Sequence, residues 1–250
     1  QPIPSLSRQD PWFTLENNIR SQLNVLEVVA QLGAKCRVLV VGSSEEYGRV
    51  SEAELPIREE TPLRPTSPYA VSKVAQDYLG LQYWLSNGVE AVRVRPFNHI
   101  GPRQRQGFVA PDFAAQVAEI EAGLRPARIS VGALDVARDF SDVRDIVVGY
   151  VLALTQGEPG EVYNLGAGRA HTVRQLLETL IAASGVEVEV EQDPARMRAV
   201  DVPLVIADCT RLHRRTGWQP VIPFEQSIRD VLDYWREQLR TGASDPTPLG

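Results

Sequence analysis

Cys36-Arg-Val-Leu-Val-Val-Gly42 is the stretch that decides the fold, because it is apolar and β-branched over almost its whole length. Such a run is typical of a parallel strand that is buried on both faces of a sheet. Before it, Thr14 to Leu32 has apolar residues at helical spacing and ends at Gly33. After it come a second long helix, predicted over Tyr69 to Leu85, and a strand over Val89 to Phe97. This alternation predicts a doubly wound parallel α/β sheet.

Shorter elements continue the alternation along the rest of the chain. We expect helices over 112–122, 145–154, 172–183 and 224–239, and strands over 129–131, 162–165 and 186–190. Residues 1–165 are predicted to form the remainder of a nucleotide-binding, Rossmann-like domain, with crossings away from its sheet after about residue 103. Residues 166–240 are predicted to form mainly a smaller substrate-binding lobe, and residues 241–250 a disordered tail.

Composition excludes several classes of function. The chain has 250 residues, 43% of them apolar, and a net charge of −6, which argues against a general phosphate-binding surface. Cys36 and Cys209 make no disulfide or metal-ligand pattern and the three histidines do not cluster, so no metal site is predicted. No apolar run reaches membrane-spanning length, and the first residues do not resemble a signal peptide. We therefore expect a soluble, cytoplasmic protein.

A Gly-rich turn is missing from the place where a nucleotide-binding sheet needs it. Such sheets start with a strand, this turn and a helix, because the turn lets backbone amides approach a pyrophosphate. No G-x-G-x-x-G pattern lies in the first hundred residues, and Gly166-Ala-Gly168 follows a late strand. We therefore expect a sheet that lacks its first βα units here, on the order of 60–70 residues at about 30 per unit.

Tyr69 and Lys73 stand four residues apart on the second predicted helix, so their side chains share one face. An ammonium group beside a phenol is expected to lower the pKa of the phenol, which would make Tyr69 a general acid and base. The alternative is an ordinary pair on a surface helix. Ser43 and Ser44 follow the first buried strand, where open α/β sheets bind ligands. A serine there either hydrogen-bonds the same substrate oxygen as Tyr69 or caps a turn.

Five motifs occur in an order that is typical of one enzyme family. They are Gly42-Ser-Ser-Glu-Glu-Tyr-Gly48, Ser67-Pro-Tyr-Ala-Val-Ser-Lys73, Arg95-Pro-Phe-Asn-His-Ile-Gly-Pro102, Arg138-Asp-Phe-Ser-Asp-Val-Arg-Asp145 and Val162-Tyr-Asn-Leu-Gly-Ala-Gly168. Together they resemble the extended short-chain dehydrogenases/reductases that modify nucleotide-linked sugars, also called the NAD-dependent epimerase/dehydratase family. The resemblance runs from about Asp10 to about Leu239, and the shared order is more specific than any one motif.

This resemblance implies the residues that act on the reacting oxygen and the cofactor. Ser43 matches the family's catalytic hydroxyl. Tyr69 and Lys73 match its acid/base tyrosine and the lysine that also binds the nicotinamide ribose. Pro96 and His99 belong to the segment that flanks the nicotinamide of NAD or NADP.

The resemblance also implies the residues that bind the nucleotide sugar. They are Ser44, Asn98, Val109, Arg138, Arg198 and Asp201. Arg138 and Arg198 match arginines that grip the diphosphate, a task that suits the planar guanidinium fork, and the alternative for each is a solvated surface charge. Asp201 matches a contact to the ribose hydroxyls. Val109 and Phe108 match the wall of the base pocket, although core packing explains them equally well.

Within the family, the segment after Pro96 narrows the substrate. Asn98-His99 resembles the branch that acts on GDP-mannose and its derivatives, and Gln104 stands where dehydratases of that branch carry a second arginine. We therefore predict that NAD(P)H reduces the C4 ketone of GDP-4-dehydro-6-deoxy-D-mannose to give GDP-D-rhamnose. Glu45 favours an alternative, a GDP-mannose 4,6-dehydratase or another nucleotide-sugar epimerase or dehydratase, because removal of the C5 proton needs such a base. A relative that binds nucleotides without catalysis is the third hypothesis.

A homodimer is implied by the same resemblance. The two long helices, around residues 14–32 and 69–85, would pack with those of a second copy as a four-helix bundle. Leu81 and Trp84 are among the apolar residues that fit either this interface or the core. Neither nucleic acid nor a membrane is expected as a partner.

Overall fold

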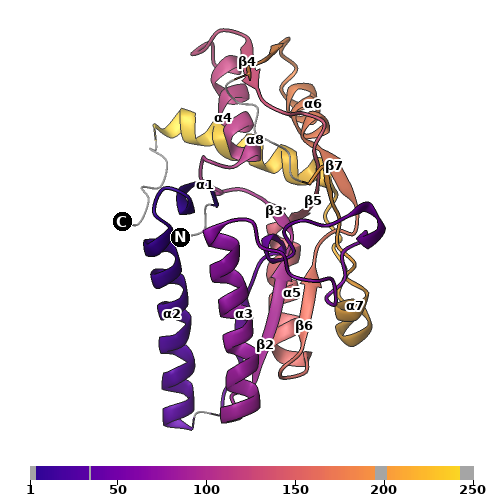
Figure 1. The fold of residues 1–250 in the computed structure, drawn as a ribbon. Coiled ribbons are helices and arrows are strands. Elements are labelled where there is room, and N and C mark those ends of the chain that lie inside the picture. The colour runs from indigo at the N-terminus through magenta and orange to yellow at the C-terminus, as the bar shows by residue number, and fades with distance from the viewer. Residues whose placement is uncertain (1–3, 34, 195–201, 243–250) are drawn as a thin grey trace.

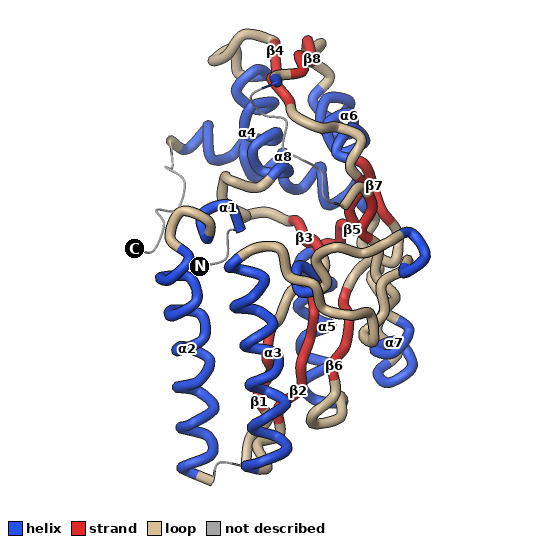
Figure 2. Tube along the Cα trace, viewed as in Figure 1, coloured by secondary structure: helices blue, strands red, loops and turns tan. Residues whose placement is uncertain are grey.

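A three-stranded parallel sheet forms the centre of the computed structural model, which describes residues 4–33, 35–194 and 202–242. Its strands are β1 (Val38–Val41), β2 (Ala91–Pro96) and β6 (Val162–Leu165), in the order β1-β2-β6. The predicted strands are therefore present, and the predicted parallel α/β sheet is confirmed. Figure 2 shows these strands running together through the lower half of the molecule.

Long helices cover both faces of this sheet. α2 (Pro11–Leu32) and α3 (Pro68–Asn87) lie side by side, and α3 packs on β1 and β2 (Figure 1). α5 (Val143–Gln156) packs on the same two strands. Asp10 and Ser67 cap the starts of α2 and α3 by accepting hydrogen bonds from Phe13 N (2.9 Å) and Ala70 N (3.1 Å).

Alternation along β2 explains why the two faces differ. Successive side chains of a strand point to opposite faces of its sheet. Val92 and Val94 belong to a buried apolar cluster with residues of α5, whereas Arg93 and Arg95 form ion pairs with Asp77 of α3. One face of the strand is therefore an apolar core, and the other carries buried charge next to the helix that bears Tyr69.

A second apolar cluster lies beyond the carboxyl ends of the central strands, at the top of Figures 1 and 2. Three helices form most of it: α4 (Val109–Glu121), α6 (Val173–Ser184) and α8 (Phe224–Thr241). β4 (Arg128–Val131) and β8 (Glu189–Gln192) form a parallel pair at its edge. All of these elements were predicted from the sequence to within a few residues.

Short elements join the two clusters and were not predicted, because few residues leave little periodicity to read. They are α1 (Pro4–Ser7), β3 (Asn98–Ile100), β5 (Ala137–Asp142), β7 (Ala170–Thr172), β9 (Leu204–Val205), α7 (Thr210–Thr216) and the 3₁₀ turns η1 (Ser44–Glu46) and η2 (Glu52–Glu54). β5 is central among them, since it pairs with β3, β7 and β9.

The chain crosses between the two clusters several times. α4 and β4 precede residue 165 yet pack in the second cluster, whereas α7 follows residue 165 and returns to the first. Leu212 of α7 and Trp218 are buried against residues of β2, α5 and β6. The two lobes are therefore divided in space rather than at one position along the chain.

Candidate active site

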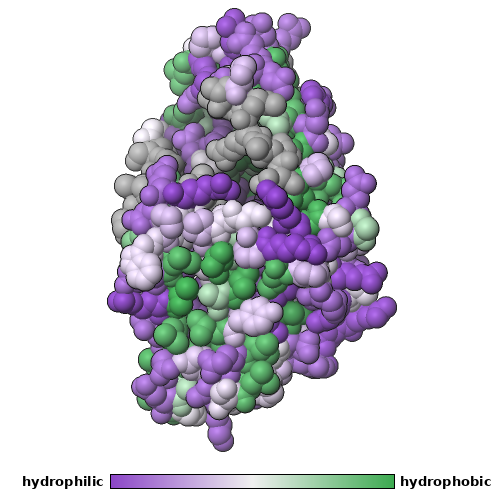
Figure 3. Space-filling model, viewed as in Figure 1, coloured by the Kyte–Doolittle hydropathy of each residue, from purple (hydrophilic) through white to green (hydrophobic). Residues whose placement is uncertain are grey.

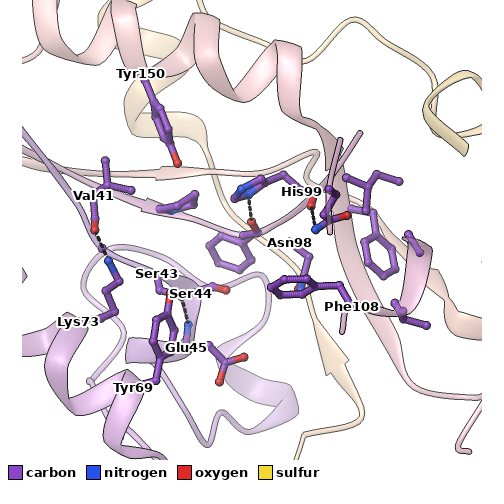
Figure 4. Close-up of a pocket in the computed structure, with 18 residues that line it drawn as sticks. Val41, Ser43, Ser44, Glu45, Tyr69, Lys73, Asn98, His99, Phe108 and Tyr150 are labelled. Atoms are coloured by element: carbon purple, nitrogen blue, oxygen red, sulfur yellow. Dashed lines mark hydrogen bonds between the residues drawn. The ribbon is translucent and has the colours of Figure 1, made fainter. Parts of the chain in front are cut away.

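Two adjoining cavities open beyond the carboxyl ends of β1 and β2, the edge where a parallel sheet is expected to bind ligands. The first has a volume of about 310 Å³ and is lined by Ser43, Tyr69 and Lys73, among others (Figure 4). The second has a volume of about 620 Å³ and extends along the second cluster to Arg138. Four residues line both cavities, namely Ser44, Glu45, Asn98 and Val109. One extended ligand can therefore occupy both.

Ser43 follows β1 after Gly42 and caps the turn η1. Its Oγ accepts a hydrogen bond from Glu45 N (3.2 Å), and its own N donates to Glu46 Oε1 (2.8 Å). The Ser43 side chain also lies close enough to Tyr69 to lower the pKa of the phenol. The capping role and the catalytic placement, which were alternatives for the sequence, therefore coexist in one buried serine.

Tyr69 and Lys73 lie one turn apart near the start of α3, as their spacing predicted. Lys73 Nζ lies 5.9 Å from the centre of the Tyr69 ring and donates a hydrogen bond to Val41 O (3.0 Å). Burial lowers the pKa of Lys73, and a nearby Glu46 opposes that shift. Val41 therefore holds the ammonium group at the end of β1, facing the first cavity.

The pKa of Tyr69 was predicted to fall below its ordinary value beside Lys73, and in this structure it is raised instead. Burial, together with the charges of Glu45 and Glu46, raises the pKa of Tyr69 to about 12, against the lowering effect of the Ser43 side chain. Burial is the largest cause of the shift, and Lys73 Nζ donates its hydrogen bond to the backbone carbonyl of Val41. Tyr69 is accordingly a proton-bearing acid at neutral pH.

The opposite wall of the first cavity comes from the end of β2, from β3 and from α5. Pro96, Asn98 and His99 all line it, as expected from the sequence. His99 Nδ1 lies 3.0 Å from Phe97 O, and Gln104 Nε2 donates to His99 O at 3.3 Å, which fixes the start of the loop after β3. Asn98 is exposed and points into the space between the cavities (Figure 4).

Glu45 and Arg138 carry the charge of the second cavity. Glu45 meets solvent inside the cavity, yet the surrounding protein buries its carboxyl enough to raise its pKa, against the lowering effect of Arg138 and Arg8. Arg138 is half-buried on β5 and donates to Ala137 O at 2.9 Å, so only part of its guanidinium fork is engaged. Glu45, Arg138 and Arg8 thus line the same cavity.

Two predicted contacts, Arg198 and Asp201, lie outside the described residues. Val109 is the first residue of α4 and lines both cavities, and Phe108 lines the first. Ser44 likewise faces both. The structure therefore brings together all the predicted site residues that it describes.

Sequence reasoning missed two further residues at the cavities. Arg8 follows α1 and lines the second cavity, with Nη2 donating to Thr66 O at 3.5 Å. Tyr150 of α5 points into the first cavity from the side opposite Tyr69 (Figure 4). No local signal identifies either one, because arginine is common in this chain and Tyr150 lies in an otherwise apolar helix.

Metal-ligand clusters and membrane-spanning helices are both absent from the described residues. Within them, no group of three or more histidine, cysteine or acidic side chains is placed to hold a metal ion. Among their helices, none is both long and apolar enough to span a bilayer.

Comparison with known proteins decides the family. The sequence pattern described as GDP-mannose 4,6 dehydratase matches residues 3–231. The chain belongs to this family. The resemblance that the five motifs indicated, to the NAD-dependent epimerase/dehydratase group of short-chain dehydrogenases/reductases, is thereby confirmed.

Individual members of the GDP-mannose 4,6 dehydratase family and their structural neighbours give a finer comparison. The GDP-6-deoxy-D-mannose reductase of Pseudomonas aeruginosa is 42% identical over 238 residues, which are 95% of this chain and 78% of the relative. The solved structure of RMD from Pseudomonas aeruginosa complexed with NADPH superposes with a TM-score of 0.92 at 40% identity, covering 95% of this chain and 79% of that one. A GDP-mannose 4,6-dehydratase of Vibrio cholerae is 27% identical, over 96% of this chain and 71% of the relative.

Proposed function

We propose that the protein is an NAD(P)H-dependent reductase of the C4 ketone of a nucleotide-linked 4-dehydro-6-deoxy sugar, with GDP-4-dehydro-6-deoxy-D-mannose as substrate and GDP-D-rhamnose as product. The observation that carries the proposal is the convergence of Ser43, Tyr69 and Lys73 on a cavity that continues to Arg138. The 42% identity to a GDP-6-deoxy-D-mannose reductase supports the choice of reaction.

The first cavity suits the nicotinamide end of NAD or NADP. Val41, Pro96 and Tyr150 offer it apolar surface, and Lys73 offers the single ammonium group of the cavity wall for a ribose hydroxyl. With Tyr69 and His99, these are the residues that we assign to the cofactor. A bound reduced nicotinamide would supply the hydride for carbon C4.

The chain's own contribution is to bind and protonate the ketone oxygen. Ser43 and Tyr69 both line the first cavity and present their hydroxyl groups to it. As negative charge develops on that oxygen, Tyr69 transfers its proton to it, so that the ketone, a hydride and a proton give the alcohol. The ammonium group of Lys73 then stabilises the resulting phenolate.

Charge and shape of the second cavity support a nucleoside diphosphate as the rest of the ligand. Arg138 offers its fork to diphosphate oxygens, and we extend this role to Arg198. Asp201 is proposed to bind ribose hydroxyls, Val109 to line the base pocket, and Ser44 and Asn98 to contact the sugar.

Glu45 supports a second candidate, the 4,6-dehydratase. Its carboxyl faces both cavities, and a raised pKa suits a group that takes a proton from C5 and gives it to a departing hydroxyl. Identity to the dehydratase of Vibrio cholerae is lower, at 27%. We therefore place the reductase first.

Two incubations of the intact protein separate these candidates. Consumption of NADH or NADPH with GDP-4-dehydro-6-deoxy-D-mannose, lost in Tyr69→Phe and retained in Glu45→Gln, is the result that the reductase predicts. Conversion of GDP-mannose to the keto sugar without net cofactor use, abolished by Glu45→Gln, would make the protein a dehydratase. Binding of the nicotinamide cofactor and of the GDP-sugar without turnover would favour a relative that binds nucleotides without catalysis.

We further propose that the protein is a cytoplasmic homodimer, with α2 and α3 at the interface. Apolar residues gather over these two helices in Figure 3, and Val25, Val28 and Leu85 are 51%, 52% and 72% exposed. Trp84, which the sequence left open between interface and core, packs on Gly160 of the same chain. Size measurement by light scattering of the wild type and of Val28→Glu tests this interface: the wild type should be a dimer and the variant a monomer.

A further inference from the structure

A fully buried carboxyl group lies directly behind the proposed catalytic serine. Glu46, the last residue of η1, is 0% exposed, and its Oε1 accepts a hydrogen bond from Ser43 N at 2.8 Å. Gly42 makes room for it, because a Cβ at that position would lie 2.2 Å from Glu46 Oε1. Gly42 and Glu46 thus act together to fix the backbone of Ser43.

The second oxygen of this carboxyl group has an ion pair but no hydrogen bond within the described residues. Glu46 Oε2 lies 3.1 Å from Arg95 Nε but has no hydrogen bond to any group in the described part of the chain. Arg95 Nε instead donates to Asp77 Oδ2 at 2.6 Å. Leaving an ionised oxygen buried and unsatisfied is costly. A proton on Oε2 removes that cost, because it can be donated to the carboxylate of Asp77, whose Oδ2 lies beside the same Arg95 Nε as Glu46 Oε2.

We propose that Glu46 is a positioning residue for the reaction: as a neutral acid hydrogen-bonded to Asp77, it holds the backbone of Ser43 so that the serine hydroxyl meets Tyr69. The inference rests on the proposed function only for its substrate. The titratable and charged groups that face Glu46 are Asp77, Lys73 and Tyr69 of α3, Arg95 of β2 and Tyr47 of the next turn.

The surroundings of Glu46 favour the protonated, neutral form of its carboxyl group. Burial and the negative charge of Asp77 raise the pKa of Glu46 to about 8, against the lowering effects of Arg95 and of the Ser43 hydrogen bond. An ionised Glu46 would also raise the pKa of Tyr69 and so weaken it as a proton donor. Neutral Glu46 therefore serves both the position of Ser43 and the acidity of Tyr69.

The chain contains a matched control for this motif. In η2, Ser51 N donates to Glu54 Oε2 at 2.8 Å, the same serine–glutamate capping box on the same kind of turn. Glu54 lies near the surface and lines neither cavity, and two hydrogen bonds from Arg64 hold its pKa at about 2. The box itself does not require a neutral acid, so the environment of Glu46 makes the difference.

Glutamine and leucine at this position separate the two parts of the proposal. Glutamine keeps an acceptor for Ser43 N and a donor for Asp77, whereas leucine keeps neither. We expect Glu46→Gln to retain most of the wild-type kcat, and to hold it at alkaline pH where the wild type declines. Glu46→Leu should lose kcat by about ten- to a hundredfold, with KM little changed. Glu54→Leu should leave kcat unchanged.

An infrared measurement reads the charge state without any substrate. The wild type should show the C=O band of a protonated carboxyl group at neutral pH, and Glu46→Gln should lack it. Equal loss of kcat in the glutamine and leucine variants, or a band that the glutamine variant retains, would overturn the proposal. Full activity of Glu46→Leu would also overturn it. If Glu46→Leu does not fold, the glutamine variant and the band decide. If the wild type is inactive on the keto sugar, the proposed function is wrong. The infrared band still tests the role of Glu46 in that case.

Discussion

Tyr47→Phe should destabilise the protein by more than an ordinary buried tyrosine-to-phenylalanine change. The Tyr47 side chain is 0% exposed, and its hydroxyl donates to Asn164 Oδ1 at 2.7 Å while accepting from Arg95 Nη1 at 3.1 Å. Asn164 is itself 0% exposed, and its Oδ1 has no other hydrogen bond within the described residues. Removal of the hydroxyl therefore leaves a buried acceptor unsatisfied.

The magnitude follows from these two contacts. An unsatisfied buried acceptor costs about 1–3 kcal/mol, and a hydrogen bond to a charged group contributes about 1.5–3 kcal/mol. Arg95 Nη1 still donates to Glu59 O at 3.1 Å, which lowers the second contribution. We therefore expect the free energy of unfolding to fall by about 2–4 kcal/mol.

Tyr163→Phe is the matched control. Tyr163 is 2% exposed, but its hydroxyl takes part in one neutral hydrogen bond, from Glu158 N at 3.0 Å, so its loss should cost about 1 kcal/mol. Urea unfolding of both variants, with unchanged slopes, gives the two free energies. Equal losses, or a larger loss for Tyr163→Phe, would refute the role assigned to the Tyr47 hydroxyl.

Three further predictions concern the site. Tyr69→Phe should lower kcat for ketone reduction by about 10²–10⁴-fold with little change in KM, measured by steady-state kinetics, and a near-normal kcat would exclude Tyr69 as the acid. Arg138→Ala should raise the KM for the nucleotide sugar about tenfold, and Arg138→Lys by less, because lysine offers charge without the fork; an unchanged KM would remove Arg138 from the binding site. Because the folded pKa of Glu46, about 8, exceeds its ordinary 4.5, its contribution to stability is full below pH 4.5 and is lost as the pH rises through 8. The free energy of unfolding of Glu46→Gln should therefore fall less than that of the wild type across this window, and parallel curves would argue against the raised pKa.

The elements with strong periodicity were predictable from the sequence. β1, α2 and α3 have long apolar patterns and clear caps, and the structure places them within a few residues of the prediction. β7 and β9 could not be found, because each has two or three residues and is held by pairing with β5. Their existence depends on contacts between segments far apart in the sequence.

The residues of the candidate site also fall into those that the sequence predicts and those that it does not. Tyr69 and Lys73 were predictable because one helical turn brings them together, and Ser43 was predictable because it follows a buried strand at the edge where such sheets bind ligands. Arg8 and Tyr150 were not, because only the tertiary fold carries them to the cavities. The pKa of Tyr69 was predicted in the wrong direction for the same reason, because burial, the largest cause of its shift, depends on the whole fold.

The most direct test of the central claim follows the hydride itself. The intact protein is incubated with GDP-4-dehydro-6-deoxy-D-mannose and NADH or NADPH that carries deuterium at both positions of nicotinamide C4, and the sugar product is examined by NMR and mass spectrometry. Reduction of a C4 ketone predicts GDP-D-rhamnose with one deuterium at sugar C4, and no labelled product from Tyr69→Phe. An unlabelled sugar, or label at any other carbon, would contradict the proposed reaction.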